Sequence, residues 1–291
     1  GYTPCELQGW ISLDAAKEIF GSAGLDLRES MMAARKPGFK ALPLPYTVGA
    51  TIKNDIRENV SKNVIAMIPG TDQKDEYIIF SAHWDHLGIG AVIDGDSIYN
   101  GARDNASGTA TLLGIAEAMA KSGPYKRSIV FLWVTAEEQG LLGSAYYAAY
   151  PVFPPDQTVA NLNIDGMASY GEMNDLSVIG FGQSDLESYA ARWAEKQNRY
   201  ILPDQEPEKG YFFRSDHFNF AKIGIPALYA EDGFDHRTKG KEYAKEKSDE
   251  YRTTAYHLPN DEYDVATFEL GGILQDAELY RNVASELGNN Q

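Results

Sequence analysis

The chain has 291 residues, a formal net charge of −16 and a hydrophobic fraction of 43%. A chain of this length and composition can bury a large core, which argues against an intrinsically disordered protein. Its negative charge repels nucleic acid and anionic membranes, so we expect neither as a partner, and no apolar run is long enough for membrane insertion. The single cysteine, Cys5, excludes an internal disulfide and leaves the cellular compartment open.

The first sixty residues predict two short helices followed by an extended segment. Ser12 is placed to cap a helix that ends at Gly21. A second helical stretch near residues 26–35 ends before Pro37. Alternating residues over 42–52 have the pattern of a strand.

From residue 63 onward, strands alternate with helices. The predicted strands cover residues 63–68, 77–81, 129–134, 159–164 and 226–229. The predicted helices cover residues 107–121 and 141–150, a stretch opened by a Ser184–Glu187 capping box, and a last stretch that meets Gly288. This alternation predicts one α/β domain, a three-layer α/β/α sandwich around a mainly parallel sheet. The early hairpin-like strands should add antiparallel edges and make the sheet mixed.

Polar side chains follow three of the predicted strands, at the carboxyl ends where such sheets usually have their active sites. With one loop and one late motif they form a set of metal-competent residues: His83, Asp85, Asp104, Glu137, Glu138, Asp165 and His257. Each of them alone has an ordinary structural explanation, such as a packed histidine or a solvated turn. Together, histidine nitrogens and carboxylate oxygens form a ligand set that suits zinc. So many carboxylates in one crevice would raise each other's pKa unless cations lay among them.

Five motifs, in order and with comparable gaps, carry a family resemblance. They are His83-x-Asp85, Asp104-Asn105-Ala106-Ser107-Gly108, Glu137-Glu138, Asn163-Ile164-Asp165-Gly166 and Tyr256-His257. The chain resembles the co-catalytic dizinc aminopeptidases, which are related to glutamate carboxypeptidase II, carboxypeptidase Q and, without metals, the transferrin receptor. The resemblance runs from about residue 60 to the C-terminus and implies the zinc exopeptidase fold. Residues 213–217 also resemble the substrate-side loop of that family.

The resemblance implies two zinc ions per chain and assigns their ligands. His83 and Asp165 would bind one zinc ion, and Glu138 and His257 would bind the other. Asp104 would bridge both ions. In relatives the peptide bond after this bridging aspartate is cis, so we expect a cis bond between Asp104 and the residue that follows it.

The resemblance also implies three catalytic roles. Asp85 would accept a hydrogen bond from the second ring nitrogen of His83 and fix its tautomer. Glu137 would not bind metal but would take a proton from the nucleophilic water. Tyr256 would donate its phenol proton to the developing oxyanion. Of the two adjacent glutamates, Glu137 would therefore transfer protons and Glu138 would bind a metal ion.

Other conspicuous residues are given no role. His86, His217 and His236 are not expected to be ligands, because the ligand set is already full. Asp94-Gly95-Asp96 is interpreted as a turn, because the remaining ligand pattern of a calcium loop is missing. For Tyr211-Phe212-Phe213, a pocket for an apolar side chain and simple core packing both stay open.

The implied function is a zinc-dependent exopeptidase that hydrolyses the N-terminal peptide bond of peptides, with a preference for apolar N-terminal residues. Its partners would be peptides with a free N-terminus. Carboxypeptidase or dipeptidase activity on the same fold stays open. The complete second-metal set argues against a glutaminyl cyclase, and the intact ligands argue against a receptor-like domain without catalysis.

The N-terminal residues 1–50 are interpreted as a lead-in segment to a single catalytic domain over 1–291. Gly9-Trp10-Ile11-Ser12 resembles the exit from the protease-associated domain that many relatives carry upstream. This chain has no room for that insert, and no signal peptide is visible at Gly1. We therefore expect either a longer natural precursor or a chain from which the insert was removed. We expect an extracellular or periplasmic location.

Overall fold

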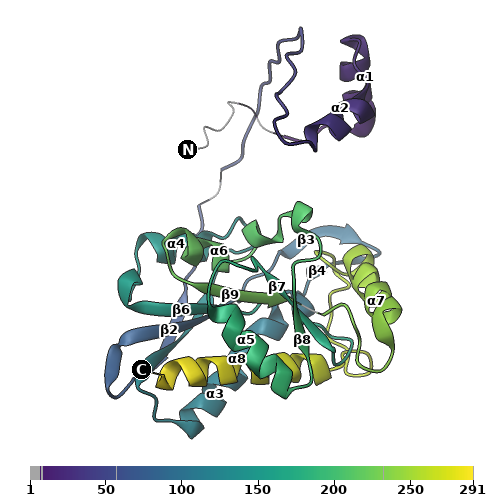
Figure 1. The fold of residues 1–291 in the computed structure, drawn as a ribbon. Coiled ribbons are helices and arrows are strands. Elements are labelled where there is room, and N and C mark those ends of the chain that lie inside the picture. The colour runs from purple at the N-terminus through teal and green to yellow at the C-terminus, as the bar shows by residue number, and fades with distance from the viewer. Residues whose placement is uncertain (1–6, 8, 57, 232, 291) are drawn as a thin grey trace. The chain divides into compact units, whose positions relative to one another are not determined.

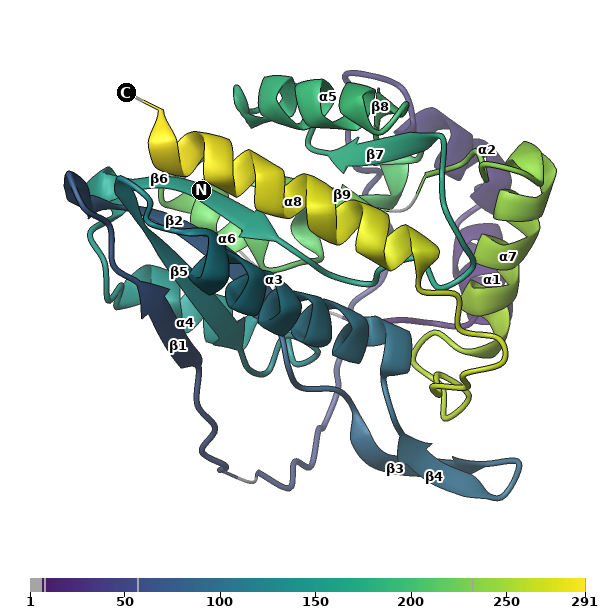
Figure 2. The same ribbon diagram turned by 90° about the horizontal axis from the view of Figure 1, so that it is seen from below.

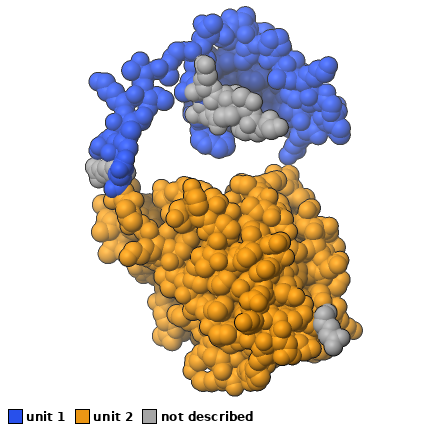
Figure 3. Space-filling view, turned by 90° about the vertical axis from the view of Figure 1, so that its left-hand side faces the viewer, with its two compact units in different colours: residues 1–58 blue, residues 59–291 orange. Residues whose placement is uncertain are grey.

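The computed structural model describes residues 7, 9–56, 58–231 and 233–290 (Figure 1). The chain forms two compact units, Gly1–Glu58 and Asn59–Gln291, coloured separately in Figure 3. Cys5 lies outside the described residues. None of the helices in the described part of the chain has the length and apolar content needed to cross a membrane.

The first unit contains the two predicted helices, α1 (Leu13–Ser22) and α2 (Leu27–Ala34). Ser12 caps α1 as predicted, because its hydroxyl oxygen accepts a hydrogen bond of 3.2 Å from the backbone N–H of Ala15. Neither helix has a buried residue. The strand predicted over residues 42–52 is wrong: these residues form no strand, and apolar side chains such as Val48 stay exposed. An alternating pattern needs a partner strand, and this segment pairs with none of the described residues.

The second unit is built on a seven-stranded sheet. Its strands, in spatial order, are β1 (Val64–Ile68), β5 (Arg127–Val134), β2 (Gln73–His83), β6 (Thr158–Asn163), β9 (Ala227–Glu231), β7 (Asp175–Ile179) and β8 (Tyr200–Pro203). The central strands β5, β2, β6 and β9 are parallel to one another. β1 is antiparallel to β5 at one edge, while β7 is antiparallel to β9 and parallel to β8. The sheet is therefore mixed and mainly parallel, as predicted.

Helices cover both faces of this sheet (Figure 2). α3 (Gly108–Ser122), α5 (Leu186–Lys196) and α8 (Gly271–Asn289) pack on one face, and α4 (Leu142–Ala149) and α6 (His217–Lys222) pack on the other. Successive residues of β2 point to opposite faces, so Ile78 and Phe80 join the core under α3 and α8, while Ile79 joins the core under α4 and α6. The three-layer α/β/α sandwich is confirmed.

The remaining elements lie outside these layers. β3 (Gly88–Ile93) and β4 (Asp96–Tyr99) form an antiparallel hairpin whose turn lies at Asp94-Gly95, where a turn was predicted. A polar helix, α7 (Gly240–Thr254), has one buried residue, Ala244. The short helical turns are η1 (Ala102–Ser107), η2 (Pro155–Gln157), η3 (Pro207–Lys209) and η4 (Tyr211–Phe213).

Two predicted helix boundaries differ from the structure. The reciprocal capping box at Ser184 is wrong, because Ser184 accepts from the N–H of Leu186 and the Glu187 carboxylate accepts from the N–H groups of residues 182 and 183. Gly288 does not end the last helix, since α8 continues to Asn289. There a larger residue would be crowded, because a Cβ on Gly288 would lie 3.3 Å from a side-chain atom of Ile129.

Candidate active site

The candidate site begins where three neighbouring strands end. His83 is the last residue of β2, and Asp165 lies two residues beyond β6. Glu137 and Glu138 follow β5 after a short turn. Because β5, β2 and β6 are adjacent and parallel, these side chains reach the same edge of the sheet.

The turn before α3 carries Asp104 to the same edge. Its peptide bond to Asn105 is cis, as the family resemblance implied. The backbone N–H groups of Arg103 and Asp104 donate hydrogen bonds of 2.9 and 3.0 Å to the carboxylate of Asp261. The side-chain oxygen of Asn105 accepts a hydrogen bond of 3.2 Å from the N–H of Gly166, beyond β6. These contacts hold Asp104 in position, and Asp261 is a residue to which the sequence analysis gave no role.

The five predicted metal ligands come together in two overlapping trios. His83 Nε2 lies 3.1 Å from an oxygen of Asp104 and 3.1 Å from an oxygen of Asp165. His257 Nε2 lies 3.3 Å from the other oxygen of Asp104 and 3.1 Å from an oxygen of Glu138. Each oxygen of Asp104 thus serves one trio, which is the arrangement of a bridging carboxylate.

These distances allow a test of whether zinc fits. Two ligands that each lie about 2.0–2.1 Å from a tetrahedral zinc ion are separated by about 3.3–3.4 Å. The observed donor separations, 3.1–3.3 Å, are close to that value, and the donors are the nitrogen and oxygen types that zinc takes. Among the described residues, three overlapping groups have ligand atoms within 4.8 Å of one another: His83 with Asp104 and Asp165, His83 with Glu137 and Glu138, and His86 with Asp104 and Glu138. The residues present therefore fit zinc.

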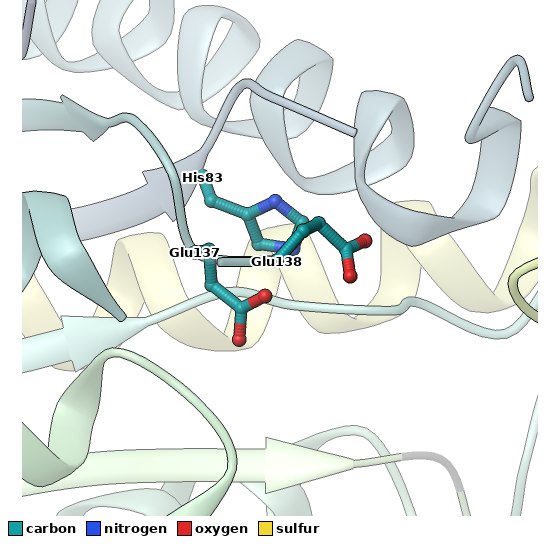
Figure 4. Close-up of side chains that lie close together, drawn as sticks. All are labelled: His83, Glu137 and Glu138. Carbon is teal, nitrogen blue, oxygen red and sulfur yellow. The ribbon is translucent and has the colours of Figure 1, made fainter. Parts of the chain in front are cut away.

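The adjacent glutamates have different surroundings, and Figure 4 shows their carboxylates pointing in different directions. Burial and the neighbouring charge of Asp165 raise the pKa of Glu137 to about 10. Burial alone would also raise the pKa of Glu138, but hydrogen bonds from His257 and His86 lower it below its usual value. Glu138 is held by two imidazoles, whereas Glu137 is held by none of the described side chains and faces a crowd of like charges. A cation bound among Glu137 and the neighbouring carboxylates would offset their mutual repulsion.

Asp85 lies behind the site, but it does not contact His83 in the predicted way. His83 Nδ1 is 3.1 Å from the backbone oxygen of Asp85 and 3.8 Å from its carboxylate. The predicted carboxylate acceptor is therefore wrong, since 3.8 Å is too long for a hydrogen bond. The carboxylate is already engaged, because it accepts from the backbone N–H groups of Glu137 at 3.1 Å and Glu138 at 3.4 Å. The side chain of Asp85 thus holds the turn that carries Glu137 and Glu138. Its backbone oxygen orients the ring of His83.

Tyr256 borders the site on the side of His257. Its ring stacks on the imidazole of His257, with ring centroids 3.9 Å apart. Burial of the phenol end, followed by the charge of Asp104, raises the pKa of Tyr256. The hydroxyl is therefore protonated at neutral pH and available as a donor.

Of the three histidines given no role, one lies at the site. His86 Nδ1 is 2.7 Å from an oxygen of Glu138, and its buried Nε2 has no hydrogen-bond partner among the described residues. Its exclusion from the ligand set stays a prediction. His217 is buried among aromatic rings, and burial lowers its pKa to about 3. His236 lies against the backbone, with Nε2 3.1 Å from the carbonyl oxygen of Tyr170.

A cavity of about 570 Å³ opens beside these residues. Its acidic side is lined by Asp104, Glu137, Glu138 and Asp165. The lining also includes aromatic and cationic side chains, among them Arg103, Tyr170, Tyr211, Phe213, Arg214, Tyr229, Phe234, Tyr251, Arg252 and Tyr256. The aromatic cluster at residues 211–213 is thereby divided, because Tyr211 and Phe213 line the cavity while Phe212 packs against other rings.

Comparison with known proteins gives a family match. The model of the family described as Peptidase family M28 matches residues 63–277. Among curated proteins, the chain is 33% identical over 138 residues to aminopeptidase NAALADL1 of Mus musculus, covering 44% of this chain and 17% of that protein. It is 29% identical over 208 residues to leucine aminopeptidase 1 of Penicillium rubens, covering 66% of this chain and 51% of that protein. The chain thus spans about half of the second relative and much less of the first.

A solved structure gives the same fold. The zinc aminopeptidase BSAP of Bacillus subtilis superposes with a TM-score of 0.58 at 23% sequence identity, covering 78% of this chain and 50% of that one. At this identity the likeness shows the architecture alone. It supports the topology of the sheet.

Proposed function

The chain belongs to peptidase family M28, and on that premise we propose that it is a zinc-dependent aminopeptidase that removes the N-terminal residue from peptides. One observation carries the proposal. The carboxylate of Asp104 lies between two trios of ligand-type atoms, and Glu137 stands beside them at a cavity large enough for a small ligand. This combination supplies both a metal-binding set and a separate proton acceptor.

The proposed metal assignment follows the two trios and takes two zinc ions per chain. His83 and Asp165 would hold one ion, Glu138 and His257 would hold the other, and Asp104 would bridge them. When bound there, zinc polarises the scissile carbonyl and lowers the pKa of water towards roughly 7. The protein's own part is to hold these five side chains at the required separations.

Glu137 would act as the general base. Its side chain lines the cavity and receives no hydrogen bond from the described side chains. Zinc ions bound beside it would lower its raised pKa and leave the carboxylate able to accept a proton. It would take that proton from the attacking water and return it to the leaving amine. Asp85 would position this base, because its carboxylate binds the backbone N–H groups of Glu137 and Glu138.

The direction of cleavage follows from charge. A peptide's free α-amine is cationic, and the acidic side of the cavity offers carboxylates that can receive it. This favours release of the N-terminal residue and argues less well for a carboxypeptidase. The aromatic walls formed by Tyr229 and Phe234 suit an apolar first side chain, so we propose a preference for apolar N-terminal residues.

A substrate panel tests the proposed function. With zinc-reconstituted protein, leucyl- and phenylalanyl-nitroanilide and a free-amine peptide should be hydrolysed, and their N-acetylated counterparts should not. The acetyl group removes the positive charge that the acidic side would bind. Equal hydrolysis of acetylated peptides from the C-terminus would support a carboxypeptidase instead. Cyclisation of an N-terminal glutamine without peptide cleavage would support a glutaminyl cyclase.

Tyr256→Phe tests the oxyanion donor. The change removes one hydroxyl and leaves the ring that stacks on His257. Losing such a donor typically lowers turnover by roughly 10²–10³-fold. We expect that decrease in kcat, with the zinc content measured by atomic absorption unchanged. An unaltered kcat would mean that the phenol does not contribute to the transition state.

A further inference from the structure

Beside the cavity, a cluster of cations surrounds one aromatic ring, Tyr211. Arg214 follows η4 directly, and Arg252 lies in α7 (Figure 1). The guanidinium carbons of both lie 5.6 Å from the centre of the Tyr211 ring, and both line the cavity. The Lys209 ammonium lies 5.9 Å from the same ring, but Lys209 is outside the cavity lining. Two elements distant in sequence therefore bring guanidinium groups to one wall.

Two of these cations share one carboxylate. Arg252 Nη1 lies 3.0 Å from a carboxylate oxygen of Glu206, which also pairs with Lys209 at 2.7 Å. A second carboxylate, Glu231, lines the cavity nearby and accepts a hydrogen bond of 3.0 Å from the Tyr229 hydroxyl. Among the described residues, these three cations form no ion pair with any carboxylate other than Glu206.

Arg214 stands out within this cluster. No carboxylate among the described residues lies within ion-pair distance of its guanidinium, which lies against the Tyr211 ring. A guanidinium presents paired N–H donors that match the two oxygens of a carboxylate. An arginine at a cavity wall without an internal carboxylate partner is suited to bind one from a ligand.

We propose that Arg214 and Arg252, which both lie beside the Tyr211 ring in the cavity lining, bind the C-terminal carboxylate of a short peptide substrate. The inference rests on the proposed aminopeptidase function and adds its substrate class, namely free di- and tripeptides. A short peptide carries a cationic amine at one end and a carboxylate at the other. The same cavity is lined by carboxylates, such as Glu137 and Asp165, and by the guanidiniums of Arg214 and Arg252, so it offers a partner of opposite charge for each end.

The test compares one dipeptide with versions that lack the terminal charge. The substrates are Leu-Ala, Leu-Ala-amide, and Leu-Glu-amide, whose only carboxylate is on a side chain. A charge-assisted hydrogen bond is worth enough to change affinity on the order of 10- to 100-fold. We expect KM for Leu-Ala to be lower than KM for Leu-Ala-amide by that factor, with similar kcat values, because a contact made equally in the ground state and the transition state changes KM and leaves kcat unchanged. A lower KM for Leu-Glu-amide than for Leu-Ala would overturn the C-terminal assignment.

Arg214→Gln is the decisive variant, because removing this guanidinium breaks no ion pair among the described residues. It should raise KM for Leu-Ala towards the amide value and leave KM for Leu-Ala-amide unchanged. Arg252→Gln should act in the same direction. Lys209→Gln is the matched control, since it removes an equal charge near the same ring but outside the cavity lining. If the control lowers discrimination as much as Arg214→Gln, general electrostatics explain the effect and the proposed contact is wrong.

A binding measurement separates this inference from the proposed function. Calorimetric titration of Leu-Ala and Leu-Ala-amide into zinc-loaded Glu137→Gln protein measures the preference without turnover. Tighter binding of the free acid, lost in the Glu137→Gln, Arg214→Gln double variant, supports the carboxylate site even if the reaction type is wrong. Hydrolysis of both substrates with equal KM and equal affinity would overturn the carboxylate site and leave the aminopeptidase proposal standing.

Discussion

Replacing Glu137 with glutamine should lower kcat by a factor on the order of 10²–10⁴. The amide keeps the size of the side chain but cannot accept a proton from water. In the proposed mechanism Glu137 is not a metal ligand, so the zinc content should stay at the wild-type value. Steady-state kinetics on leucyl-nitroanilide, together with atomic absorption on the same preparation, measures both quantities.

Glu138→Gln is the matched control, because it makes the same chemical change one residue along the chain. Its carboxylate lies 3.1 Å from His257 Nε2 and 2.7 Å from His86 Nδ1, so the neutral amide should weaken one zinc position. Activity of this variant should recover in part at high zinc, whereas that of Glu137→Gln should not. Rescue of Glu137→Gln alone would show that the two roles are reversed, and small losses in both would mean that the pair is a solvated turn.

Removal of the metal should abolish activity, and added zinc or cobalt should restore it. The ligand positions depend on a cluster of carboxylates that repel one another without a cation. We expect two zinc ions per chain after reconstitution, and a higher Tm with zinc than without, because a ligand that binds only the folded state stabilises it. Full activity in rigorously metal-free protein would falsify the proposed function.

Asp104→Asn gives the same test without a chelator. Each oxygen of Asp104 lies against a different histidine, so the neutral amide should reduce zinc content at both positions. Activity should fall to background. Normal zinc content in this variant would mean that the bridging assignment is wrong, whatever the effect on turnover.

The parts of the fold that the sequence predicts are those whose side chains follow a buried pattern. The run from Ile129 to Val134 is apolar throughout, and all of it is buried in β5. β7 lacks this signal, because Asp175 and Ser177 are buried within it. Asp175 is satisfied by the N–H groups of Phe234 and Asp235, nearly sixty residues away, which no local pattern can reveal. The four-residue β8 is too short to show a period.

The helix α7 was missed for a related reason. It has one buried residue, Ala244, so no apolar stripe distinguishes it from a charged loop. The same helix supplies Tyr251 and Arg252 to the cavity, which explains why the substrate side of the site was predicted less completely than the metal side. The metal-side residues follow predicted strands or lie in ordered motifs, whereas the cavity walls depend on tertiary contacts.

Asp261 is a residue of the site whose role no local sequence motif predicts. It lies four residues after His257, with nothing in its neighbours to mark it. Its carboxylate nevertheless accepts hydrogen bonds from the backbone N–H groups of Arg103 and Asp104, more than 150 residues earlier in the chain. Such contacts between backbone and side chain leave no periodic trace, so only the folded structure identifies them.

The β3–β4 hairpin extends from the body of the second unit between the strand end that carries His83 and the turn that carries Asp104 (Figure 2). Its two strands are closed at the base, where Gly88 pairs with Tyr99 and the next rung joins Ile89 to Ile98. Residues beyond this closure, such as Val92, are exposed. We therefore expect the length of the β3–β4 hairpin to have little effect on the spacing of the candidate ligands next to its base. We expect the turn at Asp94-Gly95 to accept inserted chain, such as a reporter tag, without altering the spacing of the candidate ligands.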